Sequence, residues 1–148
     1  MTDKGSSDDT DKMLSVMDFG KMMDVAGMVA AQNEKHRKET ADLLLRFLDV
    51  IDSLQALGEH CQELVASGYE HVPLRSVNTT LHQALNVLSQ VGVEQMNAAG
   101  HPLDLAHHEV DAVSPDSSVE ADTVLEEKVR GYLWKGALLR RAKVLISR

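Results

Sequence analysis

The sequence has 148 residues and a net charge of −8, from 15 Lys and Arg against 23 Asp and Glu. This balance argues against a nucleic-acid duplex or an anionic membrane as the main partner, because both are polyanions. Only 3% of the residues are aromatic, so the core must consist of Leu, Val, Met and Ala, a composition that favours packed helices.

The same composition predicts a cytoplasmic protein. The N-terminal residues are polar and acidic, and they lack both the apolar core of a secretory signal and the Arg-rich face of a transit peptide. No stretch reaches the roughly 18 apolar residues that span a bilayer. Cys61 is the single cysteine, which excludes an intramolecular disulfide and a Cys-based zinc site and suits a reducing compartment.

A long helix is predicted after a polar leader. Residues 1–12 have nothing to bury and predict a disordered leader. Residues 13–57 contain no proline and predict one helix, paired with a second copy, far beyond the average length of about 12 residues. Its segment 32–39, QNEKHRKE, is polar on all faces and must stand in water or pair loosely. The apolar stretch 43–57 can bury one face completely.

Residues 58–99 predict the remaining bundle helices and a loop. Gly58 is expected to break or bend the long helix before residues 59–67 resume it. The pair Val72-Pro73 marks a loop, because the residue before proline is pushed out of the helical region. A second helix is predicted over residues 74–91, with Gly92 as its C-cap.

Residues 100–148 predict a small C-terminal β-domain. Alternation of apolar and polar residues replaces the helical period over residues 109–112, 124–133 and 138–146. The string Trp134-Lys135-Gly136 is a hairpin turn signal between the last two segments. Residues 103–127 contain acids and no Lys or Arg, whereas residues 128–148 contain bases and no acid, which is typical of opposite charges paired across strands. The fold class is therefore α+β: a long N-terminal helix, a helical hairpin and a β-domain.

No enzyme, metal or cofactor signature stands out. The sequence lacks a Gly-rich phosphate loop and a Gly-x-Ser-x-Gly elbow. His101, His107 and His108 lie near Asp104 and Glu109. Adjacent histidines on a strand point to opposite faces, however, so His107 and His108 do not easily share one ion. We therefore expect neither catalysis nor a bound metal or cofactor.

Several strings, in order and at matching spacings, carry a family resemblance. Residues 48–54, LDVIDSL, are similar to an L-x-P-V-[IL]-D-[NS]-L segment, and residues 91–94, VGVE, to an F-G-V-E junction. Leu103-Asp104 followed by His108-Glu109 has the spacing of [FL]-D-P-x-x-H-[EQ]. Over residues 13–148 the sequence thus resembles the GrpE family, the nucleotide exchange factors of the bacterial DnaK chaperone. Shorter matches follow in the family's order: Val119-Glu120, Thr123-Val124, Gly131-Tyr132 and Leu139-Arg140-x-Ala142-x-Val144.

The resemblance implies a homodimer in which paired long helices lead to a four-helix bundle, with a β-domain on each side. In the family, the β-domain binds the nucleotide-binding domain of DnaK and opens its cleft, so that ADP leaves without covalent chemistry or a cofactor. One helical hairpin cannot cover the chain's aliphatic face alone, which predicts a dimer interface. Its residues are Leu44, Leu48, Ile51, Leu54, Leu81, Leu85 and Leu88.

Four positions depart from the family pattern. The proline of its D-P pair is Leu105, and an apolar position after the H-[EQ] pair is Asp111. A glycine associated with chaperone binding is Ser76, and the arginine of the turn before the last strand is Ala137. The alternative function is therefore a structural or adaptor dimer that kept the fold and lost or specialised its exchange activity. The residues that the resemblance places at the chaperone contact are Ser76, Leu103, Asp104, His108, Glu109, Tyr132, Lys135, Gly136, Ala137, Arg140 and Ile146.

For several of these positions a packing role competes with contact. Tyr132, Leu139, Val144 and Ile146 are expected to fill the small β-domain core. Lys135 and Arg140 are balanced between solvated charges and contacts with the chaperone.

Overall fold

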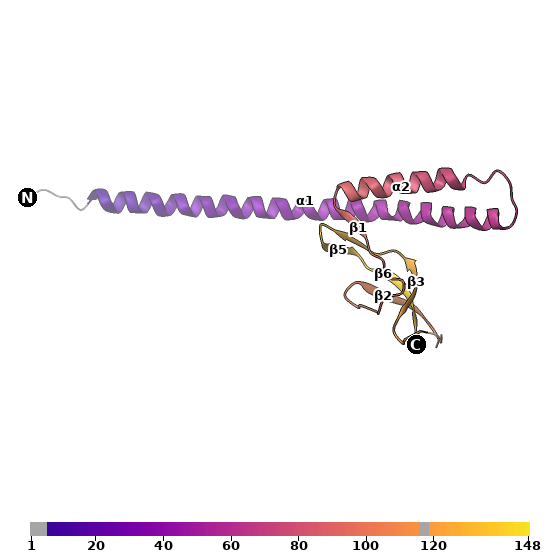
Figure 1. Cartoon of the computed structure of the whole chain (residues 1–148). Coiled ribbons are helices and arrows are strands. Elements are labelled where there is room, and N and C mark those ends of the chain that lie inside the picture. Colours follow the sequence, from indigo (N-terminus) through magenta and orange to yellow (C-terminus); the bar gives the residue numbers. More distant parts are fainter. Residues whose placement is uncertain (1–5, 116–118) are drawn as a thin grey trace, which may run out of the picture. The chain divides into compact units, whose positions relative to one another are not determined.

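A computed structural model describes the backbone of residues 6–115 and 119–148, and the side chains within those ranges from residue 19 on. Two helices come first in the chain, α1 (Ser6–Ala66) and α2 (Leu74–Gln90), and all six strands follow (Figure 1). The chain divides into two compact units, residues 1–43 and 44–148. Neither helix, over the residues described, has a stretch long and apolar enough to cross a membrane.

The first unit contains the N-terminal part of helix α1. The helix begins at Ser6, so the prediction of a disordered leader is wrong for residues 6–12, and residues 1–5 lie outside the described residues. Every side chain over residues 19–40 is exposed. The polar segment 32–39 carries ion pairs one turn apart, Lys38–Glu34 at 3.8 Å and Lys35–Glu39 at 3.9 Å. Such pairs stabilise a helix by only about 0.3–0.5 kcal/mol each, but they need no core.

Helix α1 continues through Gly58 to Ala66, so the predicted break at Gly58 and the predicted helix end at residue 57 are wrong. Gly58 is buried beside α2, where an added Cβ would lie 3.4 Å from Asn78 Oδ1 and 3.8 Å from a Val77 methyl group. An added Cβ would thus make ordinary van der Waals contacts with α2, so Gly58 lies at the contact between the two helices without being required there. The helix ends instead before Gly68, which has a φ of 85°. The Gly68 amide donates to Val65 O and the Tyr69 amide donates to Leu64 O, both at 3.0 Å. This arrangement is a Schellman motif.

Helix α2 ends close to its predicted boundary. Gly92 follows the C-cap residue Val91 with a φ of 83°, and its amide donates to Ser89 O at 2.9 Å. The chain turns there directly into the first strand, β1 (Val93–Gln95). The β-region thus begins before residue 100, where the sequence placed its boundary.

The β-region consists of two three-stranded sheets. In the first, of order β1-β4-β5, all neighbours are antiparallel; in the second, of order β2-β6-β3, β2 runs parallel to β6 and β3 antiparallel. The predicted strands 124–133 and 138–146 are each split in two, because the chain passes from one sheet to the other at Gly131 and at Arg141. The remaining strands are β2 (His108–Ser114), β3 (Val124–Val129), β4 (Tyr132–Trp134), β5 (Ala137–Arg140) and β6 (Ala142–Ser147).

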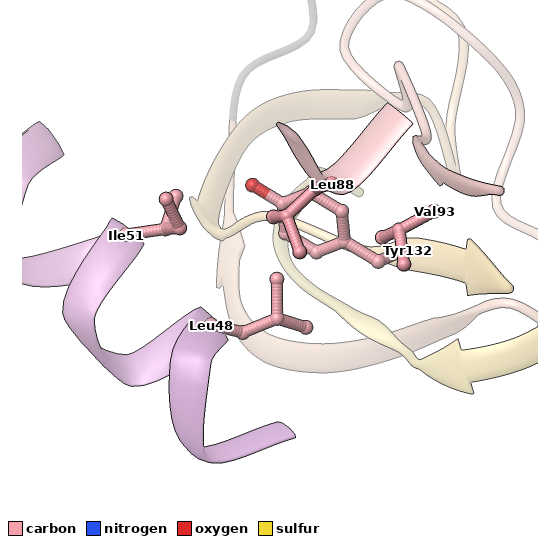
Figure 2. Packing of buried hydrophobic residues seen from close by; sticks show 5 residues of the cluster. All are labelled: Leu48, Ile51, Leu88, Val93 and Tyr132. Atoms are coloured by element: carbon pink, nitrogen blue, oxygen red, sulfur yellow. The ribbon is translucent and has the colours of Figure 1, made fainter. Parts of the chain in front are cut away.

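Two hydrophobic clusters hold the second unit together. The first joins the helices to the first sheet: side chains of α1, α2, β1 and β4 meet around the Tyr132 ring (Figure 2). Its buried members are Leu48, Ile51, Leu88, Val93 and Tyr132. The second cluster is associated with the second sheet, and Leu103 packs against this cluster. Its buried members are Ala98, Val124, Ala142, Val144 and Ile146.

The predicted hairpin turn between β4 and β5 is confirmed. Lys135 and Gly136 have φ values of 50° and 78°, so both central residues of this two-residue turn lie in the left-handed region. This is the pattern of a type I′ turn, whose twist matches that of antiparallel strands and which favours glycine at its second position.

Replacing Gly131 with alanine is expected to destabilise the β-region. An added Cβ would lie 2.8 Å from the Ala142 amide nitrogen and would also overlap the end of the Met96 side chain. Overpacking of this kind costs roughly 1–3 kcal/mol, measurable as a lower free energy of urea-induced unfolding. Gly27→Ala is the matched control, because nothing lies within 4 Å of its added Cβ and alanine is the better helix former. An equally stable Gly131→Ala variant would contradict the described packing.

Candidate functional site

The tip of the β4–β5 hairpin brings together three of the residues predicted at the chaperone contact, Lys135, Gly136 and Ala137. Lys135 and Gly136 are exposed, and the Lys135 ammonium lies 5.5 Å from the centre of the Trp134 ring. Leu138 follows with 43% of its surface exposed. The tip therefore presents a cation beside apolar surface.

The hairpin tip is fastened to the end of helix α2. The Lys135 amide donates to Gly92 O at 2.7 Å, and Trp134 Nε1 donates to Val91 O at 3.1 Å. An added Cβ at Gly92 would lie 3.0 Å from Lys135 Cγ, so glycine permits this close approach. Sequence reasoning gave Gly92 the role of a helix cap and a place in the matched string 91–94, and no local signal points to its contact with the turn.

Arg140 lies inside the chain's own structure. Its two terminal nitrogens donate to the Asp52 carboxylate of helix α1 at 2.7 and 2.8 Å, and its guanidinium also donates to Arg130 O. Only 18% of the Arg140 side chain and 33% of the Asp52 side chain are exposed. Arg140 is thus a charge paired within the chain and not a free solvated one, and its contact with the chaperone stays a prediction. Sequence reasoning gave Asp52 no role, although it lies in the matched string 48–54.

Tyr132 is 1% exposed and belongs to the first hydrophobic cluster. Among the described residues, its hydroxyl has no hydrogen-bond partner. The nearby Gln55 side chain contributes only the smallest of the effects on its pKa, a lowering. Burial raises the pKa of the Tyr132 phenol, and the nearby Asp52 carboxylate raises it further. The Arg140 guanidinium, centred 5.4 Å from the ring, opposes this rise only in part. The residue therefore packs the core, as expected, and offers no surface to a partner.

The 103–109 string forms a self-contained turn. His107 Nδ1 lies 2.6 Å from Asp104 Oδ2, and the Ala106 amide donates to Asp104 Oδ1 at 2.9 Å; these two bonds lower the pKa of the Asp104 carboxyl. The Asp104 amide in turn donates to His108 Nδ1 at 3.1 Å, and His108 is 8% exposed. Asp104 and His108 thus form hydrogen bonds that stabilise their own loop.

The other predicted contact residues are dispersed. Leu103 and Ile146 belong to the second cluster, and the exposed Glu109 pairs across strands with Lys143 at 3.9 Å. Ser76 is exposed in the first turn of α2, about 22 Å of helix away from the Gly92 end, at 1.5 Å per residue. Ser76 and the hairpin tip therefore do not form one compact patch. In the described part of the chain, no group of three His, Cys, Asp or Glu side chains could hold a metal ion.

The predicted dimer-interface residues divide into two groups. Leu48, Ile51 and Leu88 are 0–3% exposed within one chain, which leaves them almost no surface for a second copy. The half-buried residues are Leu44, Leu54, Leu81 and Leu85. The exposed apolar side chains in the same region were missed, although the 4-3 spacing of Phe47, Val50, Leu54 and Leu57 is a signal for them. These exposed side chains are Phe47, Val50, Leu57, Val87 and Val91.

Comparisons with known proteins agree on one family. The GrpE family model matches residues 27–148. The chain is 37% identical to "Protein GrpE" of Chromohalobacter salexigens over 115 residues, which cover 77% of this chain and 53% of that protein. It is 32% identical to "Protein GrpE" of Prosthecochloris aestuarii (68% of this chain, 50% of that protein) and 31% identical to that of Carboxydothermus hydrogenoformans (79% and 59%). The chain spans about half the length of the curated relatives it matches.

The Tyr132 phenol is expected to ionise above its ordinary pKa of about 10. The variant Tyr69→Phe leaves Tyr132 as the only phenol, so absorbance at 295 nm against pH reports it alone. Because the folded state holds the proton more tightly, the stability that this group contributes is present below pH 10 and is lost as the pH rises through the folded pKa. In denaturant, the midpoint should fall back to about 10. A folded-state midpoint at or below 10 would contradict the described burial.

Proposed function

We propose, since this chain belongs to the GrpE family, that it is a co-chaperone which binds the nucleotide-binding domain of a DnaK-type chaperone and accelerates ADP release. The matched residues 27–148 include most of α1, all of α2 and all six strands. Such a protein does no covalent chemistry and needs no cofactor. It binds the open state of its partner more tightly than the ADP-bound closed state, and linkage then lowers nucleotide affinity by the same factor.

The observation that carries this proposal is the exposed, anchored Lys135-Gly136 turn. Its φ values, its amide bond to Gly92 O and the Trp134–Val91 hydrogen bond all restrain the tip before any partner arrives. A restrained tip loses little conformational entropy on binding, which favours affinity. Lys135 gives this tip a positive charge in a chain of net charge −8, so it suits a carboxylate on the partner.

We also propose that the protein acts as a homodimer in the cytoplasm. The side chains of Phe47, Val50 and Leu57 on α1, of Val87 on α2 and of the α2 C-cap residue Val91 are apolar and exposed. Exposed apolar side chains grouped on neighbouring elements are typical of interaction surfaces. A second copy of the same surface is the partner that the family resemblance implies. The half-buried Leu44, Leu54, Leu81 and Leu85 keep part of their apolar surface exposed, and we include them in the proposed interface.

An adaptor dimer without exchange activity is the second candidate. It is favoured by Ala137 and Ser76, which stand where the family pattern has an arginine and a glycine. Stopped-flow release of a labelled ADP from the DnaK of the same organism separates the two functions. We expect this protein to accelerate ADP release. Binding to the chaperone without acceleration would favour the adaptor. No binding to the chaperone would reject DnaK as the partner.

Ala137→Arg is expected to tighten binding to the DnaK nucleotide-binding domain by roughly 10- to 100-fold, the equivalent of one charge-assisted hydrogen bond of about 1.5–3 kcal/mol. A guanidinium grips a carboxylate with two parallel bonds, whereas the Lys135 ammonium is a point charge. Lys135→Ala should weaken binding, and added salt should weaken it further. Titrations at two salt concentrations test both variants. If neither moves the affinity by more than about twofold, roughly 0.4 kcal/mol, the turn is not in the interface.

Val50→Glu is expected to shift the protein from dimer to monomer without unfolding it. Val50 is 52% exposed in the single chain, so a charge there is tolerated by the monomer but is desolvated between two copies. Sedimentation equilibrium at micromolar concentration measures the shift. Gln62→Glu is the matched control, because it adds the same charge at an exposed position about 120° around the helix. A wild-type protein that sediments as a monomer would refute the dimer.

A further inference from the structure

We propose that the Arg140–Asp52 ion pair is the joint that fixes the first sheet against helix α1 and thereby aims the Lys135-Gly136 turn at the chaperone. Arg140 is then a positioning residue for chaperone binding and does not itself touch the partner. The inference rests on the proposed function, because it concerns how the same turn is presented.

The ion pair has the geometry of a directional joint. Arg140 Nη1 donates to Asp52 Oδ2 at 2.7 Å, and Nη2 donates to Oδ1 at 2.8 Å, so the two planar groups meet edge to edge. Arg140 Nε and Nη2 also donate to Arg130 O, at 3.2 and 2.9 Å. These four hydrogen bonds use most of the five N–H donors of a guanidinium. Side chains so engaged, and only 18% and 33% exposed, have little capacity left for a partner.

The joint supplies what the neighbouring hydrophobic cluster lacks. Asp52 follows the buried Ile51 on α1, and Arg140 is the cross-strand partner of Tyr132, whose ring packs against Leu48 and Ile51. Apolar contact is non-directional, so on its own it tolerates sliding of the sheet over the helix. A two-pronged arginine–carboxylate contact permits one orientation only. The ion pair thus sets the angle, and the cluster supplies the attraction.

The constraint reaches the turn through a short, paired strand. Arg140 is the last residue of β5 and Ala137 is the first, and Ala137 pairs with Trp134 beside the turn. Four residues of strand span only about 13 Å. The Trp134–Val91 hydrogen bond holds the other end of the hairpin to α2. The turn is therefore fixed from both ends, by α1 through Arg140 and by α2 through Trp134.

Direct contact of Arg140 with the chaperone makes the opposite prediction for Asp52. To reach a partner, Arg140 must break its hydrogen bonds with Asp52. The half-buried Asp52 carboxylate would then be left unpaired, at a cost in free energy. Removal of the Asp52 charge would then release Arg140 and leave binding unchanged or tighter. If the pair is a joint, removal of either charge lets the first sheet shift against α1, which misorients the turn and weakens binding.

The test is a double-mutant cycle on binding of the wild-type and variant proteins to the DnaK nucleotide-binding domain. We expect Asp52→Asn and Arg140→Gln each to weaken binding by roughly tenfold, and the double variant to be no weaker than either. The charge swap Asp52→Arg with Arg140→Asp should recover part of the loss. The control cycle uses Glu126→Gln and Lys128→Gln, an exposed pair 2.7 Å apart on a single strand, and should change affinity by less than twofold. Binding that is unchanged or tighter in Asp52→Asn overturns the proposal.

A distance measurement separates positioning from loss of stability and from failure of the proposed function. In a Cys61→Ala background, spin labels at Glu63→Cys on α1 and Leu138→Cys on β5 occupy exposed positions of the second unit. Pulsed electron paramagnetic resonance, with labelled chains diluted in unlabelled ones, gives their distance distribution in folded protein. We expect a narrow distribution in the parent and in the control pair, and a broader one in Asp52→Asn and Arg140→Gln. Unchanged widths overturn the joint, whereas a broadening in a protein that binds no DnaK rejects the proposed function alone.

Discussion

The burial of one aromatic ring at the junction of helix and sheet is the constraint on which the second unit depends. Tyr132 is the largest fully buried side chain of the described residues, in a chain with only 3% aromatics. Side chains from α1, α2 and β1 converge on it (Figure 2). Burial of such a ring supplies the non-directional attraction. Its hydroxyl, which has no hydrogen-bond partner among the described residues, opposes burial by roughly 1–3 kcal/mol. Burial of apolar surface therefore stabilises the junction, and polar contacts must determine how the helices and the sheet are oriented there.

Those polar contacts lie at the rim of the cluster and link segments that are distant in sequence. Asp52 and Arg140 are 88 residues apart, and Trp134 and Val91 are 43 apart. The Arg140 guanidinium and the Trp134 indole N–H each form directional hydrogen bonds, and these bonds bury little surface area. Together they convert an apolar contact that tolerates sliding into a fixed platform for the β4–β5 hairpin. An exposed tip can then carry the charge of Lys135 without being flexible.

The sequence predicted what local chemistry decides and missed what distant contacts decide. The turn at Lys135-Gly136 and the cap at Gly92 follow from left-handed backbone at glycine, and both were predicted. Gly58 was misjudged, because the low helix propensity of one glycine is outweighed where the long helix packs against α2. The strand breaks at Gly131 and Arg141 were missed for the same reason, since only the second sheet explains them. In the site, periodicity identified an aliphatic face but not which part of it α2 and the sheet already cover.

The family's missing arginine at Ala137 bears differently on binding and on exchange. A contact made equally to the open and the closed chaperone raises affinity for both states and leaves the ratio between them unchanged. Its loss then requires more protein for the same effect, but at saturation the release of ADP is as fast as before. A contact made only to the open state contributes to the coupling itself, and its loss slows release at any concentration. Since the anchored turn is restrained before binding, it presents the same surface to both states, and the distinction depends on how the chaperone's own surface moves. Ala137 is therefore compatible with the proposed exchange activity at weaker binding. The concentration dependence of ADP release is then more informative about this chain than the release rate at one concentration.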